Sequence, residues 1–313
     1  MSTANPSTPV PVAVISGFLG SGKTTLVKRV LTGDHGLRIT VLVNDFGAID
    51  IDSQLLASQS ANSISLKNGC ICCNLQNDLL GELQGLLEQE GGPPDFLLIE
   101  SSGVSDPGKI IHALRYPQLR ERFQINTVLT LLNAATINDL EGEFKHLAMA
   151  QLDAADIVVI NQTDCVDEQQ LEQVHAQWLY PTARVLTTSY ADIPIDLLFA
   201  MHEHDVSETP FQPLTRDHGG LFYSYSWTSD KTLQLDALRQ FAKTLPNSIF
   251  RAKGVFYTEQ LAGQRVVLQA VGTRQEWGKD SQISRERRSD LVMIAMQPID
   301  ELTMQQALDA CLV

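Results

Sequence analysis

Residues 17–24 of the chain are GFLGSGKT, which matches the phosphate-loop pattern G-x-x-x-x-G-K-[ST] at every fixed position. Glycines in such a loop let backbone N–H groups turn inward around phosphates, and the N-terminus of the following helix adds positive potential. The apolar run Val10–Ser16 predicts a buried strand before the loop, and residues 26–31 carry the apolar face of a helix after it. This context favours a phosphate-binding strand–loop–helix unit over a glycine-rich turn that fits the pattern by accident.

The pattern assigns roles to individual residues around a bound Mg–nucleotide. Lys23 is expected to reach the β- and γ-phosphates, and the Thr24 hydroxyl is expected to ligate Mg²⁺. Further nucleotide contacts are expected from Gly17, Gly20, Ser21, Gly22 and Thr25. The stretch therefore predicts a P-loop nucleotide hydrolase.

Short apolar runs alternate with helical patterns through the first two-thirds of the chain. The predicted strands are Val10–Ser16, Arg38–Val43, Ile64–Leu66, Asp95–Glu100, Asn126–Leu132, Ile157–Asn161 and Arg184–Thr188. Helical spacing predicts helices over Leu75–Gln89 and Asp167–Leu179, the second capped by Asp167. This alternation predicts an α/β fold, a mostly parallel sheet with helices on both faces and its ligand at the carboxyl ends of the strands.

A second, smaller domain is expected beyond a change in composition. Acidic, proline and glycine residues replace apolar periodicity between His202 and Gly220, which indicates a linker at about 202–220. We therefore predict a P-loop domain over residues 1–208 and an α+β domain over 209–313, without a catalytic motif in the latter. Its predicted elements are strands at Phe222–Trp227, Phe250–Tyr257, Arg265–Val271 and Leu291–Met296, and helices at Leu233–Leu245 and Glu301–Cys311.

The composition narrows the classes of partner and compartment. Hydrophobic residues make up 43% of the 313 residues and charged residues 19%, an ordinary balance for a globular protein. The net charge is −14 with no lysine and arginine cluster, so neither nucleic acid nor anionic membrane is an expected partner. No apolar run approaches the ~20 residues of a membrane span, and residues 1–9 lack signal-peptide features. Three of the five cysteines fall within residues 70–73, a spacing unlike that of a secreted disulfide framework. We therefore expect the protein to lie in a reducing cytoplasm.

A carboxylate ends the predicted strand Asp95–Glu100. Glu100 is the expected acid that orders Mg²⁺, usually through a water, and the N–H of Gly103 is then placed to sense the γ-phosphate. Strands also end in acids for simple solvation. The complete phosphate loop elsewhere in the chain favours the functional interpretation.

The segment Asn161-Gln162-Thr163-Asp164 resembles the N-K-x-D loop with which GTPases read the base. In that loop the aspartate accepts hydrogen bonds from guanine, so Asn161 and Asp164 are candidate base-binding residues. The usual lysine is replaced by Gln162, which keeps an ATP-dependent enzyme open as an alternative. Asn and Asp also commonly start turns after strands.

The segment Asn68-Gly69-Cys70-Ile71-Cys72-Cys73 places three thiols within four positions. Thiolates are good ligands for soft metals such as Zn²⁺ or Cu⁺. A structural zinc site needs four ligands, and no matching second pair is present, which indicates an open, exchangeable site. A packed cysteine cluster or a redox pair remains an equal alternative from the spacing alone.

Taken together, these motifs resemble the CobW family of P-loop GTPases. The matching stretches are Gly17–Thr25, Asn44–Gly47, Asn68–Cys73, Glu100–Gly103 with Asp106-Pro107, Asn161–Asp164, Arg251–Gly254 and Ser289–Ala295. The family is implicated in metal delivery or metalloenzyme activation. The resemblance implies a transition-metal site at Cys70, Cys72 and Cys73, for Zn²⁺ with Co²⁺ or Ni²⁺ as other options.

The resemblance also implies a switch loop around Asp45, which orients the attacking water or a Mg²⁺-bound water. Some relatives place acidic residues beside this motif, where this chain has Val43 and Ala48, leaving Asp50 and Asp52 as further nearby carboxylates. No histidine-rich tract is present, which argues against metal storage.

The resulting hypothesis is a slow, Mg²⁺-dependent GTPase with Lys23, Asp45 and Glu100 as its catalytic residues. GTP and a client metalloenzyme or apo-protein are its expected partners, and the lack of an evident arginine finger fits slow turnover. A nucleotide-binding thiol sensor or scaffold without turnover is the alternative from another class.

Overall fold

The computed structural model describes residues 9–33, 36–43, 63–65, 75–89, 92–199, 223–261, 264–272, 274–280, 288–295 and 297–313. The chain divides into two compact units, one of Met1–Pro181 with Val185–Ala200 and one of Thr182–Arg184 with Met201–Val313. The predicted linker at 202–220 and the predicted boundary after residue 208 lie outside the described residues.

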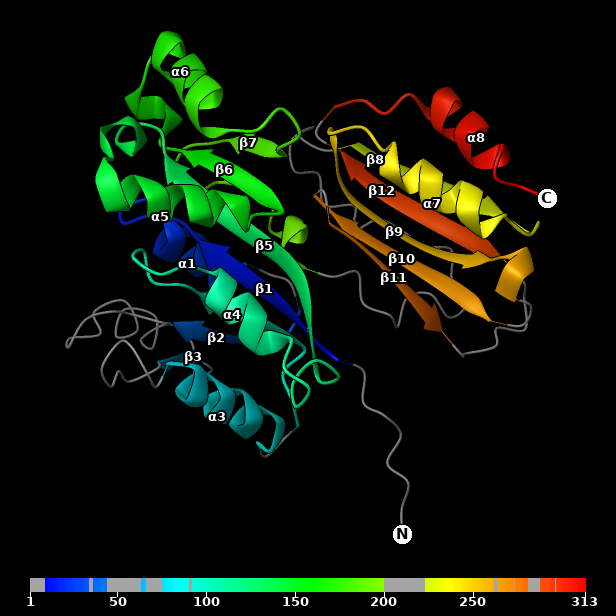
Figure 1. The fold of residues 1–313 in the computed structure, drawn as a ribbon, viewed down its shortest axis with the longest axis horizontal. Helices are drawn as coiled ribbons and strands as arrows, with labels where there is room; N and C mark the ends of the chain where they lie inside the picture. The colour runs from blue at the N-terminus through cyan, green and yellow to red at the C-terminus, as the bar shows by residue number, and fades with distance from the viewer. Residues whose placement is uncertain are drawn as a thin grey trace. The chain divides into compact units, whose positions relative to one another are not determined.

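The first unit is built on a seven-stranded sheet in which every strand pair is parallel. The strand order is β3-β2-β4-β1-β5-β6-β7, so β1 lies between β4 and β5. Figure 1 shows β5, β6 and β7 on one side of β1 and β2 and β3 on the other. The strands are β1 Val10–Ser16, β2 Ile39–Val43, β3 Ser63–Ser65, β4 Phe96–Glu100, β5 Phe123–Asn133, β6 Ile157–Asn161 and β7 Val185–Thr187. The expected parallel α/β sheet is confirmed.

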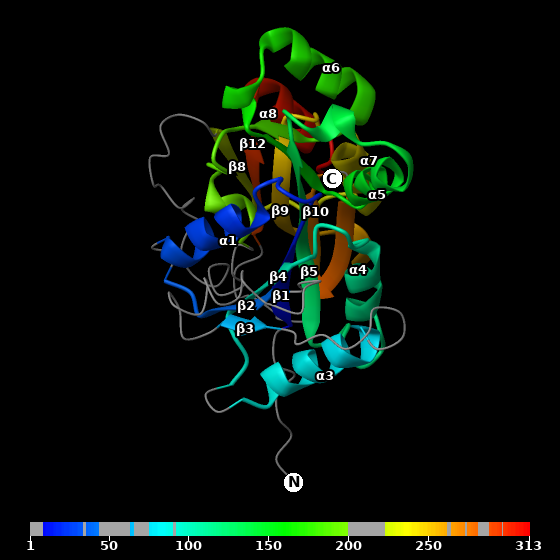
Figure 2. The same cartoon turned by 90° about the vertical axis from the view of Figure 1, so that its left-hand side faces the viewer.

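Helices cover both faces of this sheet, as Figure 2 shows for α1 on one side and α4 on the other. The helices are α1 Lys23–Thr32, α3 Leu75–Leu87, α4 Gly108–Leu114, α5 Gly142–Asp153 and α6 Glu168–Trp178, with short 3-10 turns at Ile137–Asp139, Thr163–Cys165 and Ile195–Leu197. Because both faces are covered, the central strands are apolar almost throughout, as the buried run of β1 illustrates.

The predicted cap of α6 is confirmed. Asp167 Oδ1 accepts a hydrogen bond from the Gln170 N–H at 2.8 Å, and the Gln170 side chain accepts one from the Asp167 N–H at 3.0 Å. This reciprocal pair satisfies two N–H groups at the start of the helix. Helices α4 and α5 were not among the predicted elements.

The second unit is a five-stranded antiparallel sheet of order β11-β10-β9-β12-β8. Its elements are β8 Tyr223–Ser229, α7 Leu235–Lys243, β9 Ile249–Tyr257, the 3-10 turn Glu259–Leu261, β10 Arg265–Val271, β11 Arg274–Asp280, β12 Ser289–Ala295 and α8 Glu301–Asp309. Helices α7 and α8 share one core with alternate residues of the strands, and Phe256 and Leu268 are among its fully buried side chains. The predicted α+β unit is confirmed, with β11 as an unpredicted edge strand.

In the part of the chain that the structure describes, no helix is long and apolar enough to cross a membrane.

Candidate functional site

The sheet brings three of the predicted motifs to one edge. Ile15, just before the phosphate loop, is paired in register with Glu100 at the end of β4. On the other side of β1, Asn133 at the end of β5 pairs with Asn161 at the end of β6. The carboxyl ends of these strands therefore bring together the phosphate loop, Glu100 and Asn161–Asp164, as the parallel topology predicts. We call Asn161–Asp164 the base-reading segment after its predicted role.

The phosphate loop needs glycine at two of its positions. Gly17 has φ 136° and Gly22 has φ 104°, values that side-chain-bearing residues rarely adopt. A Cβ atom on Gly17 would collide with the Leu131 carbonyl oxygen, and one on Gly22 would collide with Asn161 Nδ2. Helix α1 begins directly after Gly22, so the N–H groups of its first turn have no intrahelical acceptor and point toward the loop.

Lys23 is buried within this loop. Its Nζ donates a hydrogen bond to the Phe18 carbonyl oxygen at 3.1 Å, which folds the ammonium group over the loop itself. Burying an ammonium group in this way requires such polar partners. The arrangement places a positive charge against the phosphate loop.

Thr24 and Glu100 form the second polar contact of the site. The Thr24 hydroxyl donates a hydrogen bond to Glu100 Oε1 at 2.8 Å, which links the first turn of α1 to the buried end of β4. Hydroxyl and carboxylate oxygens are ligands that Mg²⁺ accepts in phosphate sites. The two oxygens of Thr24 and Glu100, next to Lys23 in the loop, therefore fit the ligand chemistry of a Mg²⁺ ion.

The loop after β4 touches the phosphate loop. A Cβ atom on Gly103 would lie 2.9 Å from the Leu19 N atom, so only glycine allows this close approach. The loop is held from α5 by Gln151, whose side chain is 1% exposed. Gln151 Nε2 donates hydrogen bonds to the backbone carbonyl oxygens of Gly103 at 3.2 Å and Ser105 at 3.0 Å. Gln151 was not predicted from the sequence, where its only signal is a polar residue at a core position of a helix.

Asn161 links the base-reading segment to the phosphate loop. Its Nδ2 donates a hydrogen bond to the Ser21 carbonyl oxygen at 2.9 Å, and its Oδ1 accepts one from the Ala191 N–H at 2.9 Å. Gln162 has a left-handed backbone, φ 61°, and its Nε2 donates to the Gly20 oxygen at 3.0 Å. The glutamine therefore supplies a second contact to the phosphate loop at the position where the motif usually has lysine.

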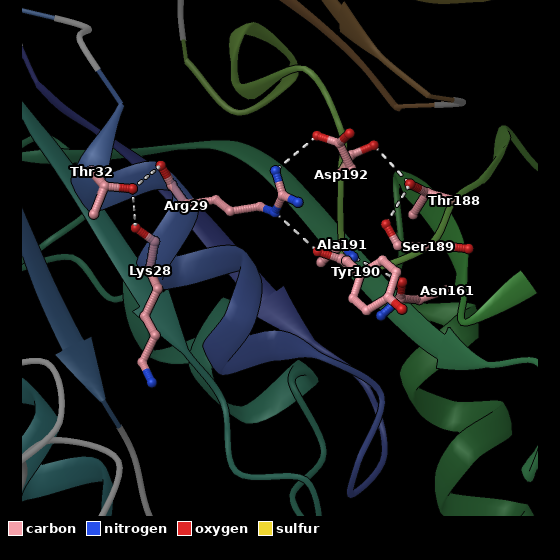
Figure 3. A network of polar contacts seen from close by, with 9 residues as sticks. All are labelled: Lys28, Arg29, Thr32, Asn161, Thr188, Ser189, Tyr190, Ala191 and Asp192. Atoms are coloured by element: carbon pink, nitrogen blue, oxygen red, sulfur yellow. Dashed lines mark hydrogen bonds and ion pairs between the residues drawn. The ribbon is translucent and has the colours of Figure 1, made fainter. Parts of the chain in front are cut away.

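Asp164 is exposed, while its backbone is held from the segment that follows β7. The Asp164 N–H donates to Ser189 Oγ at 3.1 Å, and Thr163 Oγ1 donates to the Thr188 carbonyl oxygen at 3.1 Å. Figure 3 shows this segment, Thr188–Asp192, beside Asn161. This segment was not predicted as part of the site, although its polar residues at the end of a predicted strand of the same sheet were an available signal.

Asp45, Cys70, Cys72 and Cys73 lie outside the described residues, so their expected roles stay predictions. Within the described ranges, no group of three or more His, Cys, Asp or Glu side chains is arranged to hold a metal ion.

Family models match both units of the chain. Residues 11–185 match the model described as "CobW/HypB/UreG, nucleotide-binding domain", and residues 222–312 match "Cobalamin synthesis protein cobW C-terminal domain".

Individual relatives agree with these matches. A protein named zinc chaperone CobW from Sinorhizobium sp is 26% identical over 348 residues, covering 96% of this chain and 97% of that protein. Zinc chaperone YjiA from Escherichia coli K12 is 34% identical over 213 residues, 64% of this chain and 66% of that protein. The crystal structure of Zn(II)-bound YjiA GTPase from E. coli is 25% identical, covers 97% of this chain and 99% of that chain, and has a TM-score of 0.47.

The collision at Gly22 yields a test of the site. Gly22→Ala adds a Cβ atom against Asn161 Nδ2 in a backbone conformation that costs about 1–2 kcal/mol for alanine. Displacing Asn161 removes its bond to Ser21, worth a further ~1–3 kcal/mol when buried groups lose partners. We expect nucleotide affinity to fall at least about 10-fold in a titration with a fluorescent nucleoside triphosphate.

The matched control is Gly36→Ala. Gly36 also has a positive φ, 68°, but a Cβ atom there meets nothing within 4 Å. This variant should bind nucleotide like the parent protein. Equal affinities of the Gly22→Ala variant and the parent would contradict the assignment of the loop.

Proposed function

This chain belongs to the CobW/HypB/UreG family of P-loop GTPases, and from that membership we propose that it is a slow, Mg²⁺-dependent GTPase that delivers zinc to a client metalloprotein. The observation that carries the hydrolytic part is the Thr24–Glu100 contact of 2.8 Å beside the buried Lys23. It joins the hydroxyl and the acid that a Mg–nucleotide site requires, at the mouth of a complete phosphate loop.

The residues of the loop act by positioning and by charge. Lys23 binds the β- and γ-phosphate oxygens in place of the Phe18 carbonyl, and the first-turn N–H groups of α1 donate to the same oxygens. Mg²⁺, when bound, neutralises charge on the phosphates. Gly103, held by Gln151, offers its N–H to the γ-phosphate. We assign to Asp45 the orientation of the attacking water or of a Mg²⁺-bound water.

Base recognition is assigned to Asn161 and Asp164. The exposed Asp164 carboxylate accepts two hydrogen bonds from guanine, while its backbone is held by Ser189. Adenine offers no matching pair of donors, so the proposal predicts selectivity for GTP over ATP.

The zinc cargo is assigned to Cys70, Cys72 and Cys73. Relatives of this chain are named zinc chaperones, and three neighbouring thiols without a matching second pair suit a metal that must be released again. Loss of the γ-phosphate on hydrolysis releases the loops that contact it, which gives nucleotide state a means to alter the metal site. A reducing cytoplasm keeps such thiols available, and we place the protein there.

Lys23→Ala tests the phosphate contact. The variant loses a charge-assisted contact to the reacting phosphate, so phosphate release from GTP should fall at least about 100-fold. The fold should persist by circular dichroism, because Lys23 serves the ligand. Phosphate release should be measured with GTP and with ATP, each with and without Zn²⁺.

The control for this test is Lys28→Ala. Lys28 lies on the same helix, and Figure 3 shows its side chain pointing away from Asn161, so its variant should hydrolyse GTP like the parent. Hydrolysis of GTP by the Lys23→Ala variant at the parent rate would remove the loop from the mechanism. Turnover of ATP by the parent protein as fast as that of GTP would favour the ATP-dependent alternative.

Asp164→Asn tests the reading of the base. Asparagine places a donor against a guanine donor, which should weaken GTP binding by ~1–3 kcal/mol, or about 5- to 150-fold. Xanthosine triphosphate, whose 2-oxo group accepts that donor, should bind the variant better than GTP. The control is Asp167→Asn, because asparagine caps a helix as well as aspartate does. An unchanged preference for GTP would assign base recognition to another segment.

The zinc proposal is tested by competition against a chelating dye. Thiols lose protons on binding a metal, so Zn²⁺ uptake should release protons and weaken at acidic pH. Cys72→Ser with Cys73→Ser should remove most of the affinity, whereas Cys165→Ser, at an exposed thiol of the first unit, should not.

Coupling between the two sites requires reciprocity. GTP must change Zn²⁺ affinity by the factor by which Zn²⁺ changes GTP affinity, typically ~5–150-fold. The titration is run without nucleotide, with GDP and with a non-hydrolysable GTP analogue. Three identical Zn²⁺ affinities would leave a GTPase that binds metal without coupling, and equal affinities of parent and double-serine protein would favour a thiol sensor.

A further inference from the structure

The segment that follows β7 has an unusual backbone. Tyr190 and Ala191 are consecutive non-glycine residues in the left-handed region, with φ 57° and 52°. This conformation is costly for residues with a Cβ atom and persists only where surrounding contacts hold it. Burial of the Tyr190 ring does not supply that support, because the residue is 69% exposed. Hydrogen bonds on both sides of the buried Ala191 supply support of this kind.

One set of these bonds comes from the base-reading side. The buried Ala191 donates its N–H to Asn161 Oδ1 at 2.9 Å, and Ser189 Oγ accepts from the Asp164 N–H at 3.1 Å. Within the segment, Thr188 Oγ1 donates a hydrogen bond to the Asp192 backbone carbonyl oxygen at 2.7 Å. The two residues proposed to bind guanine thus depend on this segment for their own placement.

The other set comes from a single side chain on α1. Arg29 Nε donates to the Tyr190 carbonyl oxygen at 3.0 Å, and Arg29 Nη1 donates to Asp192 Oδ1 at 2.9 Å (Figure 3). The planar guanidinium thereby holds the segment at two points, on both sides of Ala191, in a way that a lysine ammonium does not reproduce. The helix that begins at the phosphate site also supports the base site.

A role in overall stability does not account for this contact. The Arg29 and Asp192 side chains are 42% and 72% exposed, and exposed ion pairs contribute little to folding free energy. The consequence of the contact is local, because it acts on a costly backbone conformation beside Asn161.

We infer that Arg29 is a positioning residue for guanine recognition, which it supports through the Tyr190–Asp192 segment, an inference that rests on the proposed function. GDP and GTP share the base, so loss of Arg29 weakens both by one factor. The γ-phosphate contacts are untouched, so the loss raises KM for GTP and leaves kcat unchanged, as expected for uniform binding. Adenine nucleotides, which do not use Asp164, keep their affinity.

The test is Arg29→Met, which keeps the aliphatic stem and removes both donors. Titration with fluorescent GDP, a non-hydrolysable GTP analogue and the adenine counterparts should show about 5- to 30-fold weaker guanine binding. The guanine-to-adenine selectivity should fall by the same factor. Arg29→Lys should recover only part of the loss, and Asp192→Asn should lose less than Arg29→Met because the bond to Tyr190 remains.

The matched control is Arg38→Met. Arg38 forms a comparable exposed fork, with Nη2 2.7 Å and Nε 3.2 Å from the carboxylate oxygens of Asp95, at the start of β2 and away from the strand ends that carry the site. Its nucleotide affinities should equal those of the parent, and thermal melting should confirm that both methionine variants are folded.

Two outcomes overturn the inference and remain distinguishable from failure of the proposed function. Parental guanine selectivity in Arg29→Met, or an equal loss of guanine and adenine binding, would overturn the role of Arg29 while the guanine selectivity of the parent still stands. A parent protein without guanine selectivity would overturn the base assignment first, and this inference with it.

Discussion

The side-chain amide of Asn161 is the contact on which the rest of the site depends. It donates to Ser21 in the phosphate loop and accepts from Ala191 after β7, so one residue at the end of β6 joins three loops of the sheet edge. Gly22 packs so closely against it that a side chain there would displace it. A buried amide that loses either partner leaves a donor or acceptor unsatisfied, so the two bonds of Asn161 favour the observed placement of the three loops.

The exchange of lysine for Gln162 becomes intelligible beside this contact. The backbone at Gln162 is left-handed, and its side-chain amide donates to the Gly20 carbonyl oxygen, so the glutamine ties the base-reading segment to the phosphate loop. A glutamine lacks the charge and the longer stem of lysine. Under the proposed function, the neighbouring segment also supports the base, and there Arg29 from α1 supplies a charged donor.

Sequence patterns predicted the elements whose burial is set by local order, and missed the contacts that only the fold creates. The strands β1, β4 and β6 are apolar runs because both faces of a parallel sheet are covered, so their bounds and the motifs after them were predictable. Arg29 and Asp192 are 163 residues apart, and Gln151 and Gly103 are 48 apart, so no spacing rule relates them. Strand β11, RQEWGKD, carries one large apolar side chain and gave no alternation to detect.

The two sides of the nucleotide site are anchored by different elements, and this difference bears on how a nucleotide state is signalled. The loop at Gly103, which meets the γ-phosphate under the proposed function, is held by Gln151 from α5. The base-reading segment is held by Asn161 and, through the Tyr190–Asp192 segment, by Arg29 from α1. In that proposal, loss of the γ-phosphate removes a ligand contact from the loop at Gly103 and none from the base-reading segment. Under the proposed function, GDP therefore stays bound through its base while the loop at Gly103 changes its contacts, so release of the phosphate alters the surface that the loop presents without first emptying the site.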